Sequence, residues 1–260
     1  CVYDGNAKFA TVETKAGIIG IGEITNIKYY QNGTEVSPVN AGTYTVKIDV
    51  ADGDIYAAAT DIEVGTFTIT KATPTFDMFT ATPSSELVYD GTEKSIIVTT
   101  DKVGMGTFTV SYISYTDTTQ PVEPVEAGLY IVLLHIEEGD NYIAVDPLSF
   151  AGFEIEKANS VITAAPTPIA DLVYDGTAQN LINAGTATGG EMQYSLDGTN
   201  YSSAIPTGTD AKTYTVWYKV VGDKNHNDTE PASIEVSIAL KSITVTADNA
   251  SKAYGEDDPT

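Results

Sequence analysis

Hydrophobic and polar positions alternate with a period of two in short runs along most of the chain, and Gly, Asp, Asn and Pro separate the runs. Val, Ile, Thr and Tyr dominate these runs, which favours β-strands. In the clearest run, residues 43–50, the apolar positions are Tyr44, Val46, Ile48 and Val50. The alternate positions are polar, which predicts a sheet with one face in the core and one in water.

The same sequence phrases occur three times. Val2-Tyr3-Asp4-Gly5 returns at 88–91 and 173–176, so that successive tyrosines are 86 and 85 residues apart. The alternating run returns in the same register, with the apolar sets Tyr130, Val132, Leu134, Ile136 and Tyr214, Val216, Tyr218, Val220. This period predicts a duplicated unit that has the size of one small domain.

We therefore expect repeat 1 at residues 1–72, repeat 2 at 73–158, repeat 3 at 159–241 and the start of a fourth repeat at 242–260. The first and last of these look truncated, so we expect a piece of a longer protein. No Gly/Ser-rich linker separates the repeats, and such short connections predict limited bending and an elongated array.

Glycine-containing pairs predict the turns. Asn32-Gly33 and Asp197-Gly198 stand between strand-like runs, and both pairs suit a type I′ hairpin turn. Repeat 2 has Asp117-Thr118-Thr119 at this place, so its loop must be built differently. The Asp-Gly of each Val-Tyr-Asp-Gly phrase also predicts a turn. The glycine-rich residues 17–22 are expected to form a strand with a bulge, not a nucleotide-binding loop.

The phrase around Tyr44 resembles strand F of immunoglobulin domains, where a tyrosine makes the "tyrosine corner" and a cysteine follows two residues later. Tyr130 and Tyr214 match that tyrosine in the other repeats, and valine stands at the cysteine position in all three. The resemblance implies an all-β fold of three tandem immunoglobulin-like β-sandwich domains with aliphatic packing in place of the disulfide.

A wider resemblance covers nearly the whole chain. Residues 172–177 (Leu-Val-Tyr-Asp-Gly-Thr), 211–216, 222–227 and Tyr254-Gly255 resemble the bacterial MBG (YDG-type) repeats. The resemblance is most specific in repeat 3. It implies an extracellular or cell-surface location and a non-enzymatic role as an adhesin stalk or spacer, whose partners are the neighbouring domains of the same chain. It supplies no catalytic residues.

The net charge is −23, and all thirteen basic residues are lysines. An acidic surface without arginine repels nucleic acid, so nucleic-acid binding is rejected. The longest apolar stretch has the length of a strand, so we expect no membrane insertion within this segment. The single cysteine, Cys1, excludes an internal disulfide.

Few residues suggest chemistry. His135 and His226 lack a partner histidine and do not recur between repeats, so we expect no enzyme, no metal site at these residues and no cofactor. Calcium is an alternative, because acidic residues cluster at 49–54 and 137–140. Isopeptide crosslinks that involve Lys71 or Lys157 are a second open alternative.

One aromatic and three aliphatic residues lie at outward positions of the predicted strands. Trp217 corresponds to Lys47 and Leu133, so the alternation places it on the outer face of repeat 3. In repeat 2, Leu129, Ile131 and Leu133 make the same strand apolar on both sides. These four residues form the candidate interaction surface of the alternative function, a glycan- or host-protein-binding module. A loop or strand that covers them within the same domain is the simpler interpretation.

Overall fold

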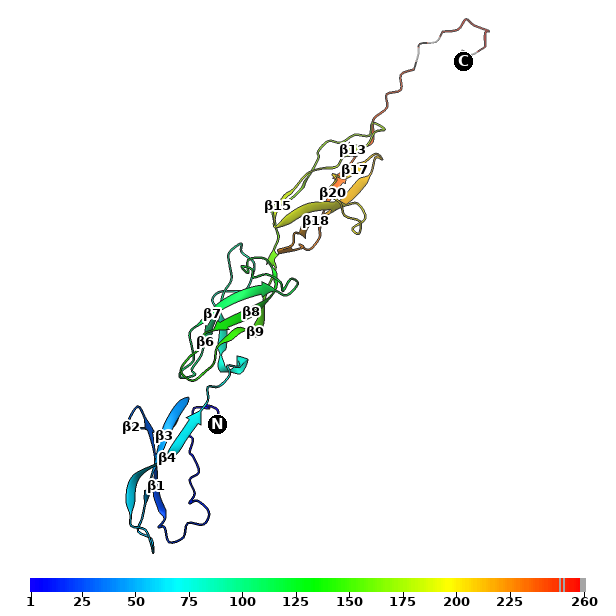
Figure 1. The fold of residues 1–260 in the computed structure, drawn as a ribbon. Coiled ribbons are helices and arrows are strands. Elements are labelled where there is room, and N and C mark those ends of the chain that lie inside the picture. Colours follow the sequence, from blue (N-terminus) through cyan, green and yellow to red (C-terminus); the bar gives the residue numbers. More distant parts are fainter. Residues whose placement is uncertain (248, 250, 258–260) are drawn as a thin grey trace. The chain divides into compact units, whose positions relative to one another are not determined.

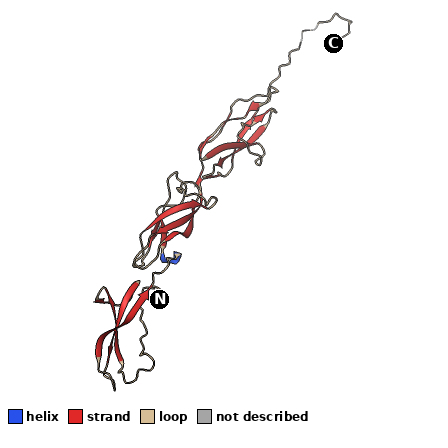
Figure 2. Ribbon diagram, in the orientation of Figure 1, coloured by secondary structure: helices blue, strands red, loops and turns tan. Residues whose placement is uncertain are grey.

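The fold is almost entirely β. We describe residues 1–247, 249 and 251–257 of a computed structural model, which divides into two compact units, Cys1–Glu156 and Lys157–Thr260 (Figure 1). Repeats 1 and 2 lie in the first unit, and repeat 3 lies in the second. The only helical element of the described residues is a short 3₁₀ turn, η1 (Phe76–Met78) (Figure 2). The described part of the chain therefore contains no helix able to cross a bilayer.

Repeat 1 contains one antiparallel sheet in the order β2-β1-β3-β4. Its strands are β1 (Ile24–Gln31), β2 (Thr34–Glu35), β3 (Gly42–Val50) and β4 (Ala59–Ile69). Residues 3–23 form no strand, and only Val2 makes an isolated bridge, with Thr70. The strand-and-bulge prediction for residues 17–22 is thus wrong. Positive φ angles at Gly17 and Gly20 turn this segment into an irregular loop.

Repeat 2 has two sheets, which cover its core from both sides. The larger sheet has the order β7-β8-β9, and the smaller one pairs β5 with β6. The strands are β5 (Thr80–Pro83), β6 (Ile96–Thr99), β7 (Phe108–Ser114), β8 (Gly128–Ile136) and β9 (Val145–Ile155).

Repeat 3 follows the same plan, with more short strands around its central strand. Its larger sheet has the order β16-β18-β20, and short pairs complete the fold: β10 with β19, β11 with β15, β12 with β14, and β13 with β17. The strands are β10 (Ala158–Asn159), β11 (Val161–Ala164), β12 (Thr167–Pro168), β13 (Gln179–Asn180), β14 (Ile182–Asn183), β15 (Thr186–Thr188), β16 (Gly190–Ser195), β17 (Thr207–Gly208), β18 (Thr213–Gly222), β19 (His226–Asn227) and β20 (Ala232–Ser237). The predicted start of a fourth repeat, at 242–260, includes residues outside the described part of the chain.

The predicted core stripes are buried. All four predicted core residues of β3 and all four of β8 are buried, as are Val216, Tyr218 and Val220 of β18. Tyr214 is only half-buried. The buried residues form three hydrophobic clusters, one for each repeat, although Tyr142 of repeat 2 belongs to the cluster of repeat 1. The period-two pattern therefore identified the core correctly.

The tyrosine corner is present in all three repeats. The hydroxyl groups of Tyr44, Tyr130 and Tyr214 donate to backbone carbonyl oxygens four residues upstream, at 2.6, 2.8 and 3.0 Å. Each bond ties the start of a central strand to the loop before it. Together with the sheets, these bonds confirm the immunoglobulin-like β-sandwich.

The turn predictions hold in part. Asn32 and Gly33 both have positive φ angles, as a type I′ turn requires. At Asp197-Gly198 only the glycine has a positive φ, so the type I′ prediction is wrong there. The Asp197 carboxylate instead accepts bonds from the Thr199 and Asn200 amides, both at 2.8 Å, and this fixes a different turn. In repeat 2, Asp117 accepts a bond from the Thr119 amide.

Replacing Tyr44 by Phe tests the tyrosine corner. The substitution removes the hydroxyl that bonds to Asn40 in a buried position, so the free energy of unfolding of the first unit should fall by about 1 kcal/mol. Denaturant titration followed by tyrosine fluorescence measures this loss. Tyr115→Phe, at an exposed tyrosine, is the matched control and should change the free energy by less than about 0.5 kcal/mol. Equal effects of the two variants would contradict the proposed role of the corner.

Candidate functional site

The joint between repeats 1 and 2, inside the first unit, brings recurring sequence phrases together. The chain leaves β4 as a short extended segment, residues 70–72, that is hydrogen-bonded on both sides. Tyr3 N–H donates to the Thr70 carbonyl at 2.9 Å, and Ala72 N–H donates to the Asn141 carbonyl at 2.9 Å. Ile143 N–H returns a bond to the Ala72 carbonyl at 2.9 Å. This extended segment therefore pairs with both repeats.

The side chain of Asn141 is the centre of this joint and is only 2% exposed. Its Oδ1 accepts a bond from the Ala41 amide at 2.8 Å. Its Nδ2 donates to Asn40 Oδ1 at 3.1 Å and to the Val103 carbonyl at 3.2 Å. Gly104 leaves room for this amide, because a Cβ at residue 104 would lie 2.5 Å from Nδ2. The buried polar group is thus satisfied by both repeats at once.

Aromatic and charged side chains surround the buried amide. The rings of Tyr3 and Tyr142 meet edge to face, with centroids 5.5 Å apart and an interplanar angle of 82°. Such pairs contribute about 0.5–1.5 kcal/mol beyond the area they bury. The Tyr3 hydroxyl also donates to the Val103 carbonyl at 3.2 Å. At the rim, Lys71 forms an ion pair with Glu138. The tyrosine of the Val-Tyr-Asp-Gly phrase is therefore a joint residue.

The equivalent loop of repeat 1 shows what the joint changes. Residues 53–56 (Gly-Asp-Ile-Tyr) match 139–142 (Gly-Asp-Asn-Tyr) of repeat 2. Ile55 and Tyr56 are 66% and 49% exposed, whereas Asn141 and Tyr142 are 2% and 5% exposed. The same loop is thus solvent-facing in one repeat and buried in the other, and the burial comes from contact with repeat 1.

The second unit has the same local pairing at its own beginning. Ala158 N–H donates to the Asn225 carbonyl at 3.0 Å, and Ser160 N–H donates to the Asn227 carbonyl at 3.4 Å. Asn225, which is also buried, holds the place in repeat 3 that Asn141 holds in repeat 2. The Lys157 ammonium donates to the Asp223 carbonyl at 3.3 Å. The isopeptide alternative for Lys71 and Lys157 stays a prediction.

The Val-Tyr-Asp-Gly phrases form the predicted turns. Gly5, Gly91 and Gly176 have φ angles of 84°, 78° and 83°. The preceding aspartates accept a bond from the amide two residues later, at 2.9, 2.9 and 2.8 Å. In repeat 2, the Lys94 side chain is 3% exposed, and its ammonium lies 2.7 Å from the Asp90 carboxylate. The bond from Lys94, followed by those from Thr92, holds the pKa of Asp90 well below its usual range.

Trp217, the main candidate for an exposed binding residue, is half-buried. Its neighbours across the sheet are Ser195 and Ser233. The turn at Gly198 packs against the Trp217 ring, since a Cβ added at residue 198 would lie 3.4 Å from the nearest indole atoms. This position agrees with the simpler interpretation, in which Trp217 packs inside its own domain.

The three aliphatic candidates of repeat 2 lie on one strand, β8. Leu129 is exposed, and Ile131 and Leu133 are half-buried. Opposite Ile131 and Leu133 the adjacent strands place Ile113 and Gly152, and Ser111 and Ser149. These three residues lie along the same strand of repeat 2, and Trp217 belongs to the other unit. Their role in binding stays a prediction.

Asp49 and the two histidine candidates have partners within their own repeats, whereas Glu138 pairs with Lys71 across the joint. Lys28 contacts both Asp49, at 2.8 Å, and Asp61, at 3.0 Å, and its bonds with these carboxylates raise its pKa. His135 contacts Ser111 and Asp146, and His226 contacts Asp223 at 2.7 Å. Among the described residues, no group of three or more His, Cys, Asp or Glu side chains is arranged to hold a metal ion.

Sequence reasoning missed Asn141. It focused on histidines, carboxylates and an outward tryptophan, which are the residue types that suggest chemistry. A usable signal was present, because asparagine follows Gly-Asp in repeats 2 and 3, directly in one and after an inserted lysine in the other. That recurrence becomes meaningful only when the shared strand brings residues 40–41 and 141 together.

A tandem of immunoglobulin-like β-sandwich modules joined through a hydrogen-bonded strand is the class of protein that the fold and the joint define. A model of the MBG domain matches residues 1–73 and 83–159, together more than half of the chain. The chain belongs to the MBG domain family. Modules of this family are generally non-catalytic and typically occur in extracellular or surface proteins. The matched residues are those of repeats 1 and 2.

Two further comparisons add little. No curated protein sequence matches the chain. Among solved structures, the fibronectin(III)-like modules of Clostridium thermocellum CbhA are similar, with 14% identity and a TM-score of 0.25. That match covers 66% of this chain and 100% of the other.

Replacing Asn141 by Leu tests the joint. The variant keeps the approximate volume but removes the acceptor of the part-buried Ala41 amide, which should cost about 1–3 kcal/mol. Hydrogen exchange of the Ala41 and Ala72 amides should become faster. Ile55→Leu is the matched control, because it alters the same loop position where the loop is exposed. Unchanged protection at Ala41 in Asn141→Leu would contradict this role of the amide.

Acid titration tests the Asp90 turn. A lowered pKa in the native state means that the charged carboxylate stabilises the fold. This stabilisation should be complete above the ordinary pKa of about 4 and should disappear as the pH falls through the lower native value. Asp90→Asn should therefore lower the stability at pH 7 and reduce its dependence on pH below about 4. Denaturant titrations at several pH values measure both effects, and Glu86→Gln, at an exposed carboxylate, is the control.

Proposed function

We propose that this chain is a structural segment of a bacterial cell-surface or secreted protein and acts as an adhesin stalk or spacer. Membership in the MBG domain family supports the surface location. The single observation that carries the spacer role is the joint around Asn141, where a buried amide bonds to both repeats.

A spacer has to transmit orientation and load from one module to the next. A flexible linker does this poorly, because it behaves as a random coil. Here residues 70–72 pair with Cys1 and Tyr3 on one side and with Asn141 and Ile143 on the other. Bending at this joint would break backbone bonds and expose the Tyr3–Tyr142 ring pair. The joint therefore resists reorientation of the two repeats.

The chemistry proposed for this segment is limited to contacts between modules. Its partners are neighbouring domains of the same chain, and it requires no cofactor. The negative charge keeps an exported chain soluble and works against association with nucleic acid and anionic lipid. The alternative, a glycan- or host-protein-binding module at Trp217, is supported less, since the ring is packed under the turn at Gly198.

Two measurements on the whole chain test the proposal. Residual dipolar couplings of repeats 1 and 2 should fit one alignment tensor, and Asn141→Leu should require two. On glycan arrays and immobilised matrix proteins, the chain should show no binding at high micromolar concentration, with or without Trp217→Ala. Independent tensors in the unmodified chain would contradict the spacer role. Binding that is lost in Trp217→Ala and kept in Trp217→Phe would establish the alternative instead.

A further inference from the structure

The two ends of each repeat pair with each other in parallel. The first of these segments contains the valine and tyrosine of the Val-Tyr-Asp-Gly phrase, and the second follows the last strand of the repeat, β4, β9 or β20. Isolated parallel bridges join the segments at three pairs of residues: Val2 and Thr70, Val88 and Glu156, and Val173 and Ala239. Each repeat is therefore closed by contact between the places where the chain enters and leaves it.

The same two backbone hydrogen bonds hold each pair of segments. In repeat 3, the Tyr174 amide donates to the Ala239 carbonyl at 2.9 Å, and the Ala239 amide donates to the Leu172 carbonyl at 2.8 Å. The tyrosine amides of the other two phrases donate in the same way at 2.9 Å, and the Thr70 and Glu156 amides return bonds of 2.8 Å. We call these two bonds the terminal clamp of a repeat.

The core anchors the clamp on the side of the last segment. The residue just before each clamp residue of that segment is an isoleucine that is at most 2% exposed: Ile69, Ile155 and Ile238. On the side of the first segment, Leu172 packs against the buried cluster of repeat 3. The paired segments cannot slide lengthwise without withdrawing apolar side chains from the core, which the hydrophobic effect opposes.

Tension along the chain enters a repeat through the first segment and leaves it through the last. In a parallel pair, the upstream end of one segment and the downstream end of the other point in opposite directions. Pulling on these two ends slides the segments past each other and loads both clamp bonds at once. In an antiparallel pair the two pulled ends would lie on the same side, and the bonds would open one after the other.

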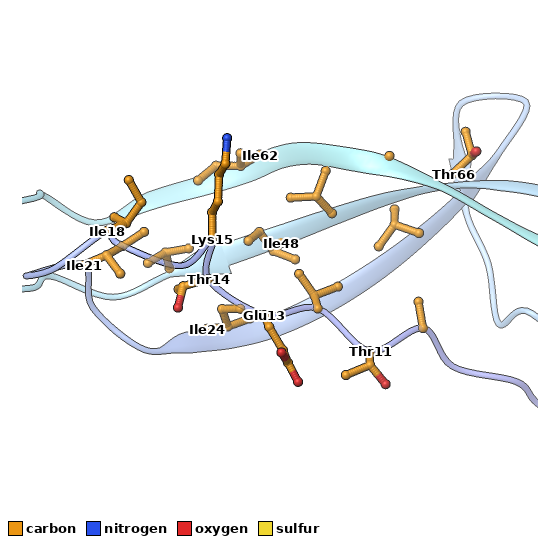
Figure 3. Close-up of a pocket in the computed structure, with 16 residues that line it drawn as sticks. Thr11, Glu13, Thr14, Lys15, Ile18, Ile21, Ile24, Ile48, Ile62 and Thr66 are labelled. Atoms are coloured by element: carbon orange, nitrogen blue, oxygen red, sulfur yellow. The ribbon is translucent and has the colours of Figure 1, made fainter.

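The chain that follows the first segment covers the core of its repeat. In repeat 1, residues 10–15 lie over the aliphatic side of the sheet, next to Ile24, Ile48 and Ile62 (Figure 3). Breaking the clamp frees the upstream end of this covering segment and opens the way for water to the apolar side chains. The clamp therefore stands between an applied tension and the core.

We propose that the terminal clamp is a load-bearing element, which lets each repeat resist tension applied along the chain. This adds a mechanical function to the proposed stalk and rests on that proposal for its purpose, because a stalk transmits pulling forces. The clamp itself lies within each repeat and does not depend on the joint around Asn141.

Force spectroscopy on the 260-residue chain, held by handles at both ends, tests the clamp. Each clamp encloses about 70 residues, so each unfolding event should lengthen the chain by up to about 250 Å. Ala239→Pro changes an exposed side chain and removes the amide that donates to Leu172. At constant force, the unfolding rate of one event should rise about two- to tenfold, because one of its two clamp bonds is lost. The other events should keep their rates.

Two variants in the same repeat separate the clamp from general effects. Leu240→Pro puts a proline beside the clamp, at an exposed residue whose amide takes no part in it, and should leave all rates under force unchanged. Ile182→Val shortens a buried side chain of the repeat 3 core. It should lower the stability of the second unit in denaturant but change the rate under force by less than about twofold.

The proposal is overturned if Ala239→Pro unfolds under force at the rate of the unmodified chain, since the barrier then lies elsewhere, for example at β11. It is also overturned if Leu240→Pro or Ile182→Val accelerates unfolding as much as Ala239→Pro does. Glu156→Pro, the equivalent change in repeat 2, is measured in the same way and decides the outcome if Ala239→Pro does not fold. The stalk proposal fails separately, on the dipolar couplings of repeats 1 and 2.

Discussion

Each repeat depends on covering one apolar face of a twisted antiparallel sheet. The central strand supplies the tyrosine-and-aliphatic stripe, and the tyrosine corner fixes where that strand begins. The hydrophobic effect makes an uncovered stripe costly, at about 25 cal/mol for each Å² left in water. Repeats 2 and 3 meet this requirement with a second layer of strands. In repeat 1 the segment of residues 10–15 lies over the same apolar side of the sheet.

At the joint between repeats 1 and 2, the polar groups that become buried need hydrogen-bond partners. A module that packs against its neighbour buries backbone amides and carbonyls, which must find partners because water is excluded. Asn141 supplies an acceptor to one repeat and donors to both. If the neighbouring repeat shifted, the Asn141 amide and its backbone partners would lose their hydrogen bonds at a cost in free energy. This cost makes the joint specific for one arrangement of the two repeats. A spacer built this way gains orientation from hydrogen bonds and stability from rings such as Tyr3 and Tyr142.

Several of the carboxylates behind the high negative charge have a structural role within their own repeat. Asp4, Asp90 and Asp175 shape turns through amide bonds, and Asp49 shares Lys28 with Asp61. Bonds that favour the ionised form lower the pKa of each of the turn carboxylates. These carboxylates bond to turn amides and to lysine, whereas the carboxylates of a cation site point toward one common ion. Much of the acidic composition therefore serves the repeat itself.

The sequence by itself determined the β class, the repeat period, the core stripes and most turns, because these depend on local alternation and on residues such as Asn32 and Gly33 that permit special backbone angles. Tertiary structure alone decided the rest. Asn141 meets Asn40 and Ala41 across about a hundred residues, and a packed turn covers Trp217. Pairing between distant segments depends on the packing of the whole module, which a period of two does not encode.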